Sequence, residues 1–106
     1  MELWYNKKMK RSEAIRKLKS HADALRALGA TSLYLFGSTA RNKATPGSDI
    51  DLFLDYDPRG RFSVLDLVAA KRLLEKGLGV EVDVTTRNGL HPLIRKRIET
   101  EATRVF

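Results

Sequence analysis

The 106-residue chain contains no cysteine, which excludes disulfide bonds, thiolate nucleophiles and zinc sites built from thiolates. It also lacks any apolar run near the ~20 residues that a membrane helix needs, and no signal-peptide-like stretch follows its charged start. Neither a Walker A motif nor a dinucleotide-binding glycine motif is present. We therefore expect a soluble, cytoplasmic protein with no membrane partner.

Histidine is scarce, because the chain holds only His21 and His91. A serine hydrolase would need one of them as its general base. We expect His21 to pack at the boundary of the first helix and His91 to serve the start of the last helix. A serine hydrolase is therefore not supported.

Positive charge is in excess, and it is unevenly distributed. The net charge is +7, and residues 1–30 hold eight Lys/Arg against three Asp/Glu, whereas residues 31–90 hold eight of each. A basic surface attracts nucleic acid, acidic protein or nucleotide phosphates with little selectivity, and it also serves solubility alone. A chain of this length builds one core, so we expect a single domain over residues 1–106, with a basic N-terminal helix in 1–30 and a catalytic core in 31–106.

Hydrophobic periodicity predicts alternating helices and strands. An amphipathic helix over residues 9–28 is closed by Gly29, and a second helix, with Ser63 as N-cap and Asp66 three residues on, runs to about Lys76 before Gly77. The remaining predicted elements are strands over 32–36, 49–54 and 80–85, a short helix after Gly37, and a final helix over 92–102. This order predicts an α/β fold in which helices flank a mixed sheet.

Two aspartates stand in phase on the second predicted strand. Side chains alternate between the two faces of a strand, so Asp49 and Asp51 share a face, with Cα atoms roughly 6.6 Å apart. Asp83 occupies the polar face of the third strand, and the three carboxylates would converge if the strands were neighbours. Carboxylates suit Mg²⁺, and the alternative for the first two is a pair of solvated residues on an outer strand face. Asp55 has the same phase but lies roughly 13 Å beyond Asp51, so we leave it out.

Gly37 and Ser38 end the first predicted strand and lead into a short helix. Backbone N–H groups and a hydroxyl at such a turn can hold a phosphate, and Arg41 can add a bidentate contact. In isolation, the pair is more simply read as a turn capped by Ser38.

The spacing of these residues resembles the signature of the DNA polymerase β-like nucleotidyltransferase superfamily. Ten residues separate Gly37-Ser38 from Asp49-Ile50-Asp51, and the likeness extends through Val82-Asp83-Val84 to the segment after His91, covering about residues 30–104. It is most similar to the minimal branch, the MntA-type antitoxins paired with HEPN ribonuclease toxins. Asn42 departs from the pattern, since many relatives have glycine there.

The resemblance implies a polymerase β-like fold and a two-metal transfer from ATP, with Asp49, Asp51 and Asp83 holding two Mg²⁺ ions. Asp83 would face the acceptor, and Gly37, Ser38 and Arg41 would hold the triphosphate. The implied activity is transfer of AMP to a tyrosine of a HEPN-type toxin, which would silence that toxin.

Two other hypotheses stay open. The chain could be a non-catalytic antitoxin that neutralises a toxin by complex formation alone, which its basic ends and small size favour. The basic first helix, with Trp4 and Tyr5, is a candidate surface for docking the partner protein. Direct nucleic-acid binding through the basic helix is the weaker alternative. Nucleotide specificity, the number of AMP groups transferred and the oligomeric state are not determined by the sequence.

Overall fold

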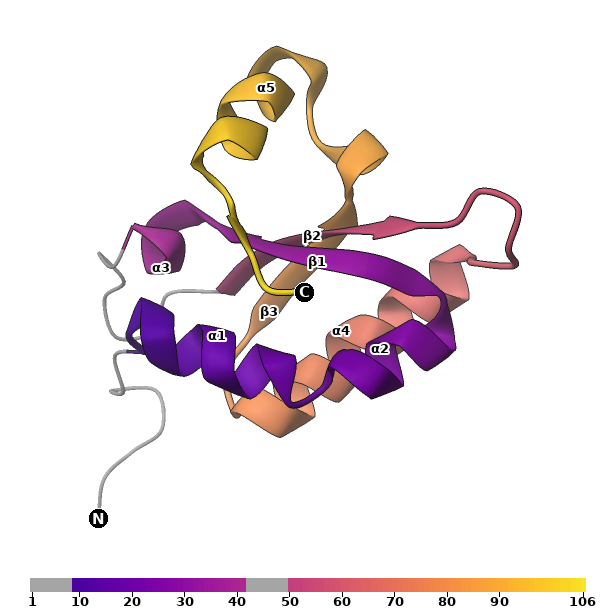
Figure 1. Ribbon diagram of the computed structural model, residues 1–106, viewed down its shortest axis with the longest axis horizontal. Helices are drawn as coiled ribbons and strands as arrows, with labels where there is room; N and C mark the ends of the chain where they lie inside the picture. Colours follow the sequence, from indigo (N-terminus) through magenta and orange to yellow (C-terminus); the bar gives the residue numbers. More distant parts are fainter. Residues whose placement is uncertain (1–8, 42–49) are drawn as a thin grey trace.

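A computed structural model describes residues 9–41 and 50–106 of the chain (Figure 1). The elements follow the predicted alternation of helices and strands, with a 3₁₀ turn and a short last strand that the periodicity did not predict. In chain order they are α1 (Arg11–Lys19), α2 (Ala22–Leu28), β1 (Ala30–Phe36), α3 (Gly37–Ala40), β2 (Ile50–Tyr56), α4 (Val64–Leu78), β3 (Val82–Thr86), η2 (Arg87–Gly89), α5 (Pro92–Glu101) and β4 (Thr103–Arg104).

The four strands form one mixed sheet in the order β3-β2-β1-β4. β1 pairs antiparallel with β2 and with β4, while β2 and β3 are parallel. Parallel neighbours need a crossover, and α4 supplies it. The expected α/β fold with a mixed sheet is therefore confirmed.

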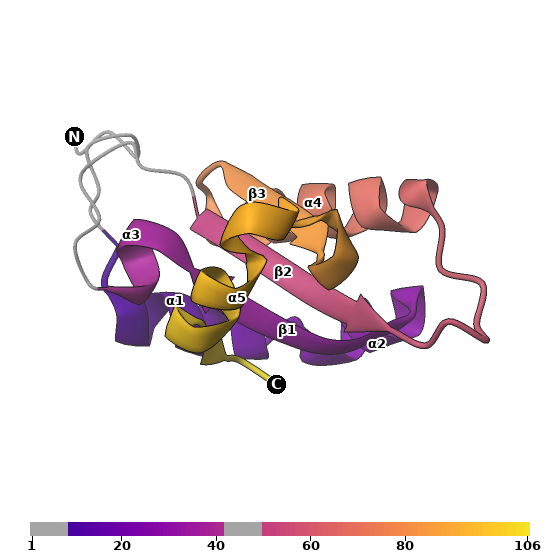
Figure 2. The ribbon, with the colours of Figure 1, turned by 90° about the horizontal axis from the view of Figure 1, so that it is seen from above.

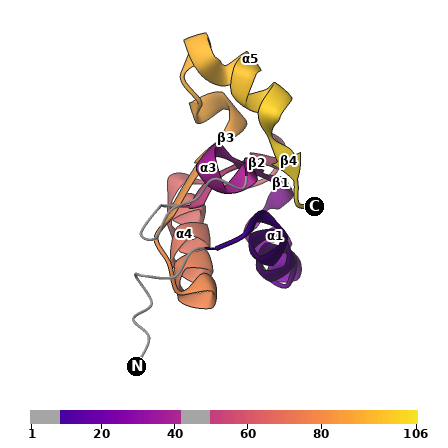
Figure 3. The same ribbon diagram turned by 90° about the vertical axis from the view of Figure 1, so that its left-hand side faces the viewer.

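Helices cover both faces of the sheet, so the strands carry apolar side chains on both sides. On one face Leu33, Leu35, Leu52, Leu54 and Val82 join the main core with residues of α1, α2 and α4. The opposite face is covered by α5, whose Ile98 packs in a second cluster with Phe53 and Leu90. Figure 3 shows α5 on one side of the sheet, with α1 and α4 on the other.

The first helix is not continuous, so the prediction of one helix over 9–28 is wrong. α1 ends at Lys19 and α2 begins at Ala22, with His21 as its N-cap residue at φ −103° and ψ 8°. The Ser20 hydroxyl donates to the Lys17 carbonyl at 2.6 Å. Serine side chains compete in this way with helical hydrogen bonds. The apolar residues keep their helical spacing across the break, so the sequence pattern does not reveal it. Gly29 does close α2, at φ 118°, as predicted.

α4 begins as predicted and ends later. Ser63 and Asp66 form a reciprocal capping box, but the helix continues past Gly77 to Leu78 and is capped by Gly79 at φ 73°. Gly77 is required for packing instead, because a Cβ there would collide with the His21 imidazole. His21 is thus half-buried between the first helices and α4, the boundary packing role expected of it.

Of the C-terminal elements, β3 begins two residues later than predicted, whereas α5 begins at the predicted residue. β3 begins at Val82 instead of residue 80, and α5 begins at Pro92 with His91 Nδ1 accepting a hydrogen bond from Leu93 N at 3.2 Å. The predicted role of His91 at the helix start is confirmed. Within the described part of the chain, no helix is long and apolar enough to cross a membrane.

Candidate functional site

Two of the three predicted metal-binding carboxylates lie on adjacent strands at the same level of the sheet. In the parallel pairing of β2 with β3, Asp51 is the direct partner of Asp83. Their neighbours Ile50 and Leu52, and Val82 and Val84, all enter the main core, so the two aspartates project from the opposite face. Asp51 is half-buried and Asp83 is exposed. The strands that carry Asp51 and Asp83 are therefore neighbours, as the predicted convergence of the carboxylates required.

The turn at the end of β1 lies directly against Asp51. Phe36, the last residue of β1, is the register partner of Asp51, and the next residue, Gly37, has a φ of +78°. A Cβ at Gly37 would stand 3.1 Å from Asp51 Cγ and 3.2 Å from its Cβ, and closer still to Oδ2. Glycine is needed here both for its backbone conformation and for the space that the carboxylate occupies. The turn and the carboxylate thus form one site, with Ser38 next in the chain.

Arg41 is the C-cap residue of α3, and its guanidinium is directed towards α5. Its Nη1 lies 3.7 Å from Glu101 Oε2, with both side chains about half exposed, at 53% and 47%. Ion pairs this exposed contribute little stability, so the guanidinium remains available to an anionic ligand. The partner is 60 residues away in sequence, and no local pattern could have indicated it.

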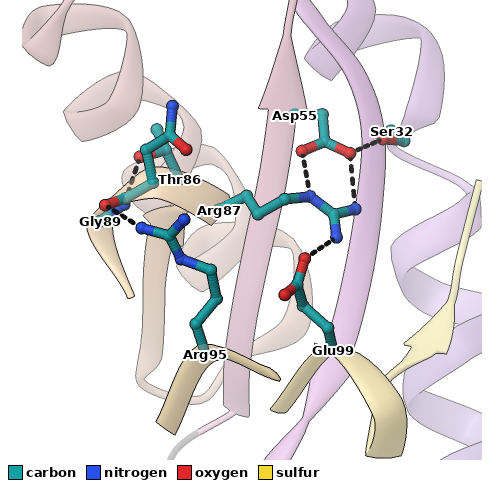
Figure 4. Close-up of polar contacts among 8 residues, drawn as sticks. Ser32, Asp55, Thr86, Arg87, Gly89, Arg95 and Glu99 are labelled. Atoms are coloured by element: carbon teal, nitrogen blue, oxygen red, sulfur yellow. Dashed lines mark hydrogen bonds and ion pairs between the residues drawn. The ribbon is translucent and has the colours of Figure 1, made fainter. Parts of the chain in front are cut away.

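Asp55 lies at the end of β2 remote from Asp51 and belongs to a different cluster. This agrees with the sequence-based choice to leave it out of the metal site. It accepts two hydrogen bonds from Arg87, at 2.8 and 2.9 Å, and one from Ser32 at 2.8 Å (Figure 4). Arg87 also donates to Glu99 of α5 and stacks on the rings of Tyr34 and Phe53. This Arg87 cluster fastens η2 and α5 to the sheet, and sequence periodicity missed it because its members are far apart in the chain.

Ionisation states in the Arg87 cluster follow from these contacts. The hydrogen bonds from Arg87 lower the pKa of Asp55 below its ordinary value, against the smaller opposing effect of burial. The same contacts, with Glu99, raise the pKa of Arg87. Asp55 and Arg87 therefore stay ionised at neutral pH, and their pairing engages both carboxylate oxygens of Asp55.

The donor set at the sheet end fits a hard divalent cation. Asp51 and Asp83 supply carboxylate oxygens from two rigid strands, and Gly37 leaves the space beside Asp51 that a bulkier residue would fill. Asp49 lies outside the described residues, so its position is not part of this geometry. Over 9–41 and 50–106, no group of three or more histidine and acidic side chains is arranged as a metal site. Asp51 and Asp83 are thus the two carboxylates that the described residues would offer to a cation.

Comparisons with known proteins agree on the family. The model of the nucleotidyltransferase domain family matches residues 11–105. A provisionally named protein adenylyltransferase of Methanocaldococcus jannaschii is 49% identical over 72 residues, which cover 68% of this chain and 75% of the relative. The protein adenylyltransferase MntA of Thermococcus cleftensis is 30% identical over 89 residues, covering 83% of this chain and 88% of that protein.

Solved structures share the fold. A provisionally named minimal nucleotidyltransferase superimposes with a TM-score of 0.77 at 33% identity, covering 90% of this chain and 95% of the other. A more distant neighbour is the Shewanella oneidensis complex of a tri-AMPylated HEPN toxin with its MNT antitoxin, with a TM-score of 0.61 at 16% identity over 87% of this chain and 71% of the matched chain. At that identity the likeness concerns the fold alone.

The match to the family model spans most of the chain, and both relatives reach the identity at which family membership is secure. The polymerase β-like arrangement of strands and turn is the one that the sequence motif predicted. This chain therefore belongs to the nucleotidyltransferase domain family and is an enzyme of its minimal nucleotidyltransferase branch.

Proposed function

We propose that the chain is a Mg²⁺-dependent protein adenylyltransferase that moves AMP from ATP to a tyrosine of a HEPN-type toxin and thereby acts as its antitoxin. The observation that carries this proposal is the register pairing of Asp51 with Asp83, with Gly37 packed against the Asp51 carboxylate. The names of the relatives, protein adenylyltransferases in both cases, support the choice of AMP and of a protein acceptor. The neighbour that contains an AMPylated HEPN toxin supports the class of partner.

The proposed reaction is a displacement at the α-phosphorus of ATP. The acceptor tyrosine oxygen forms a bond to that phosphorus, and the bond to the bridging oxygen of pyrophosphate breaks. The tyrosine proton passes to a carboxylate oxygen, and pyrophosphate leaves with the electrons of the broken bond. No covalent intermediate with the chain is needed, because catalysis of this kind depends on positioning and charge neutralisation.

Each site residue has a distinct task in this proposal. Asp51 and Asp83, together with Asp49 as the motif indicates, would hold two Mg²⁺ ions, which when bound neutralise charge on the phosphates. Asp83 is exposed and would face the acceptor, so we assign it the role of taking the tyrosine proton. The backbone of Gly37 and the hydroxyl of Ser38 would hold the triphosphate, and Arg41 would add a cationic contact. A cytoplasmic setting, where ATP is available, is part of the proposal.

The direct test is incubation of the chain with labelled ATP, Mg²⁺ and a HEPN toxin from the same genome. We expect label on the toxin with the wild-type chain and a loss of at least about 100-fold in the Asp51→Asn and Asp83→Asn variants, because each removes a charged metal ligand. Asp57→Asn is a matched control, since Asp57 is about half exposed and pairs with Arg59 in the loop after β2, apart from the candidate site. Equal labelling by all four proteins would refute the proposal.

The alternative is neutralisation by binding alone. The large apolar side chains exposed on α4 and α5, Val64, Leu65 and Leu93 among them, are the feature that favours a protein-binding role. Under this alternative, the Asp51→Asn variant would bind the toxin and still protect cells from it. Protection that disappears while binding persists would exclude it.

A further inference from the structure

The two flanks of α5 face opposite ends of the sheet. On one flank Glu99 pairs with Arg87, whose other partner, Asp55, lies at the end of β2 remote from Asp51. On the other flank Glu101 pairs with Arg41, which follows the turn that contacts Asp51. Figure 2 shows α5 crossing over the sheet from the β3 side towards the β1 side. The Glu101 flank of α5 is therefore the one that faces the candidate active site.

α5 also covers the face from which the carboxylates project. Phe53 has the same strand phase as Asp51, and it packs with Ile98 of α5 in the second core cluster. Asp51, Asp83 and α5 thus share one side of the sheet. A nucleotide held at the carboxylates would lie alongside the Glu101 flank.

Helical phase places one further cation on that flank. With 3.6 residues per turn, Arg97 lies about one turn before Glu101 and within about 40° of it around the helix axis. Lys96, although adjacent in sequence, is displaced from Arg97 by about 100° and points away from this flank. Of the cations on α5, Arg97 is thus the one aligned with the Arg41–Glu101 pair.

Among residues 9–41 and 50–106, no ion pair involves Arg97. Arg97 is exposed, and in the described part of the chain no carboxylate lies within ion-pair distance of it. Glu101 stands at the i+4 position, where a helical ion pair can form, but its carboxylate is directed towards Arg41. An unpaired guanidinium therefore borders a site whose described acidic groups, Asp51 and Asp83, suit a metal-bound nucleotide.

We propose that Arg97 is a nucleotide-binding residue that contacts the β- and γ-phosphates of the nucleoside triphosphate from the α5 side, opposite the Gly37-Ser38 turn. This inference rests on the proposed function and deepens it by adding a second side to the triphosphate site. A guanidinium suits the task because it gives charge-assisted, bidentate hydrogen bonds to phosphate oxygens. The contact also holds the leaving pyrophosphate after the bond to the α-phosphorus breaks.

The test compares Arg97→Gln with Lys96→Gln, two variants that lose the same charge from neighbouring positions on one helix. Binding of ATP and of AMP, each with Mg²⁺, is measured by calorimetry at about 0.15 M salt, where charges more than ~8 Å away are screened. We expect Arg97→Gln to weaken ATP binding about ten-fold or more and AMP binding less than about two-fold, because AMP lacks the contacted phosphates. Lys96→Gln should change both affinities less than about two-fold.

Three results would overturn the inference. An unchanged ATP affinity in Arg97→Gln would show that Arg97 does not contact the phosphates. Equal losses of affinity in the two variants would show that only the net charge of the chain matters. Unchanged ATP affinity with a raised KM for the acceptor protein would assign Arg97 to the acceptor instead. In each case wild-type binding of ATP and labelling of the toxin would leave the proposed function standing, whereas a wild-type chain that bound no ATP would remove both.

Discussion

Gly37→Ala is the sharpest test of the geometry at the candidate site, because Gly79 provides a control with nearly the same positive φ. Both glycines have a positive φ, at 78° and 73°, which L side chains rarely adopt. A Cβ at Gly79 would meet nothing within 4 Å, whereas one at Gly37 would collide with the Asp51 carboxylate. The two alanine variants therefore share the backbone cost and differ in the contact with Asp51.

The expected magnitudes follow from these two contributions. An alanine in the left-handed region costs about 1–2 kcal/mol, less a few tenths regained from the stiffer unfolded chain. Gly79→Ala should therefore lower the free energy of unfolding by about 1 kcal/mol, or Tm by about 4–8 °C. Gly37→Ala should lose a further ~1–3 kcal/mol, since the Asp51 side chain must move to relieve the overlap.

Transfer activity should separate the variants more clearly than stability does. Moving a metal-binding carboxylate by about 1 Å can reduce the rate about 100-fold, so we expect a loss of this order in Gly37→Ala. Gly79→Ala should retain near wild-type rates, because Gly79 caps α4 and is far in sequence from the turn. Urea unfolding and initial rates of AMP transfer, measured below the transition of both variants, provide the readouts. Equal rates in the two variants would refute the close packing of Gly37 on Asp51 as a requirement for activity.

Three further predictions concern the elements that hold the site. Arg87→Met leaves Asp55 and Glu99 without their cation, so the free energy of unfolding measured in urea should fall by about 2 kcal/mol; a change below about 0.5 kcal/mol would show that the cluster does not fasten α5. Because folding lowers the pKa of Asp55 from 3.8, its contribution to stability is complete above that value and is lost as the pH falls through the lower folded pKa. The difference in unfolding free energy between wild type and Asp55→Asn should therefore shrink below about pH 4, and a difference that is constant from pH 2 to 7 would contradict this. Ser63→Ala removes the capping box of α4 and should lower the unfolding free energy by about 1 kcal/mol with no change in transfer rate, unless the N-terminus of α4 takes part in the reaction.

Local sequence patterns predicted most of the helices and strands. Strict alternation located β3 to within two residues, and the Ser63 and Asp66 pair located the start of α4. The break between α1 and α2 was missed because the apolar stripe continues across Ser20, and the end of α4 was misplaced because Gly77 serves the His21 contact. At the first site a local serine hydrogen bond interrupts the helix, and at the second a glycine that looked like a helix end is instead required for packing between segments.

Sequence alone determined the chemistry that the chain carries. The spacing of Gly37-Ser38 from Asp49 and Asp51 identified the family, since a short turn and an in-phase pair of carboxylates are both local features. The role of Asp49 still rests on that motif. No tertiary information was needed to select the residue types.

Tertiary structure decided which of those residues stand together. The parallel pairing of β2 with β3 places Asp83 beside Asp51, although 31 residues and a crossover helix separate them in the chain. The contacts of Glu99 and Glu101 set the rotation of α5 about its own axis, and this rotation decides which cation of α5 faces the site. Such relations depend on packing between distant segments, and the local periodicity of the sequence does not encode them.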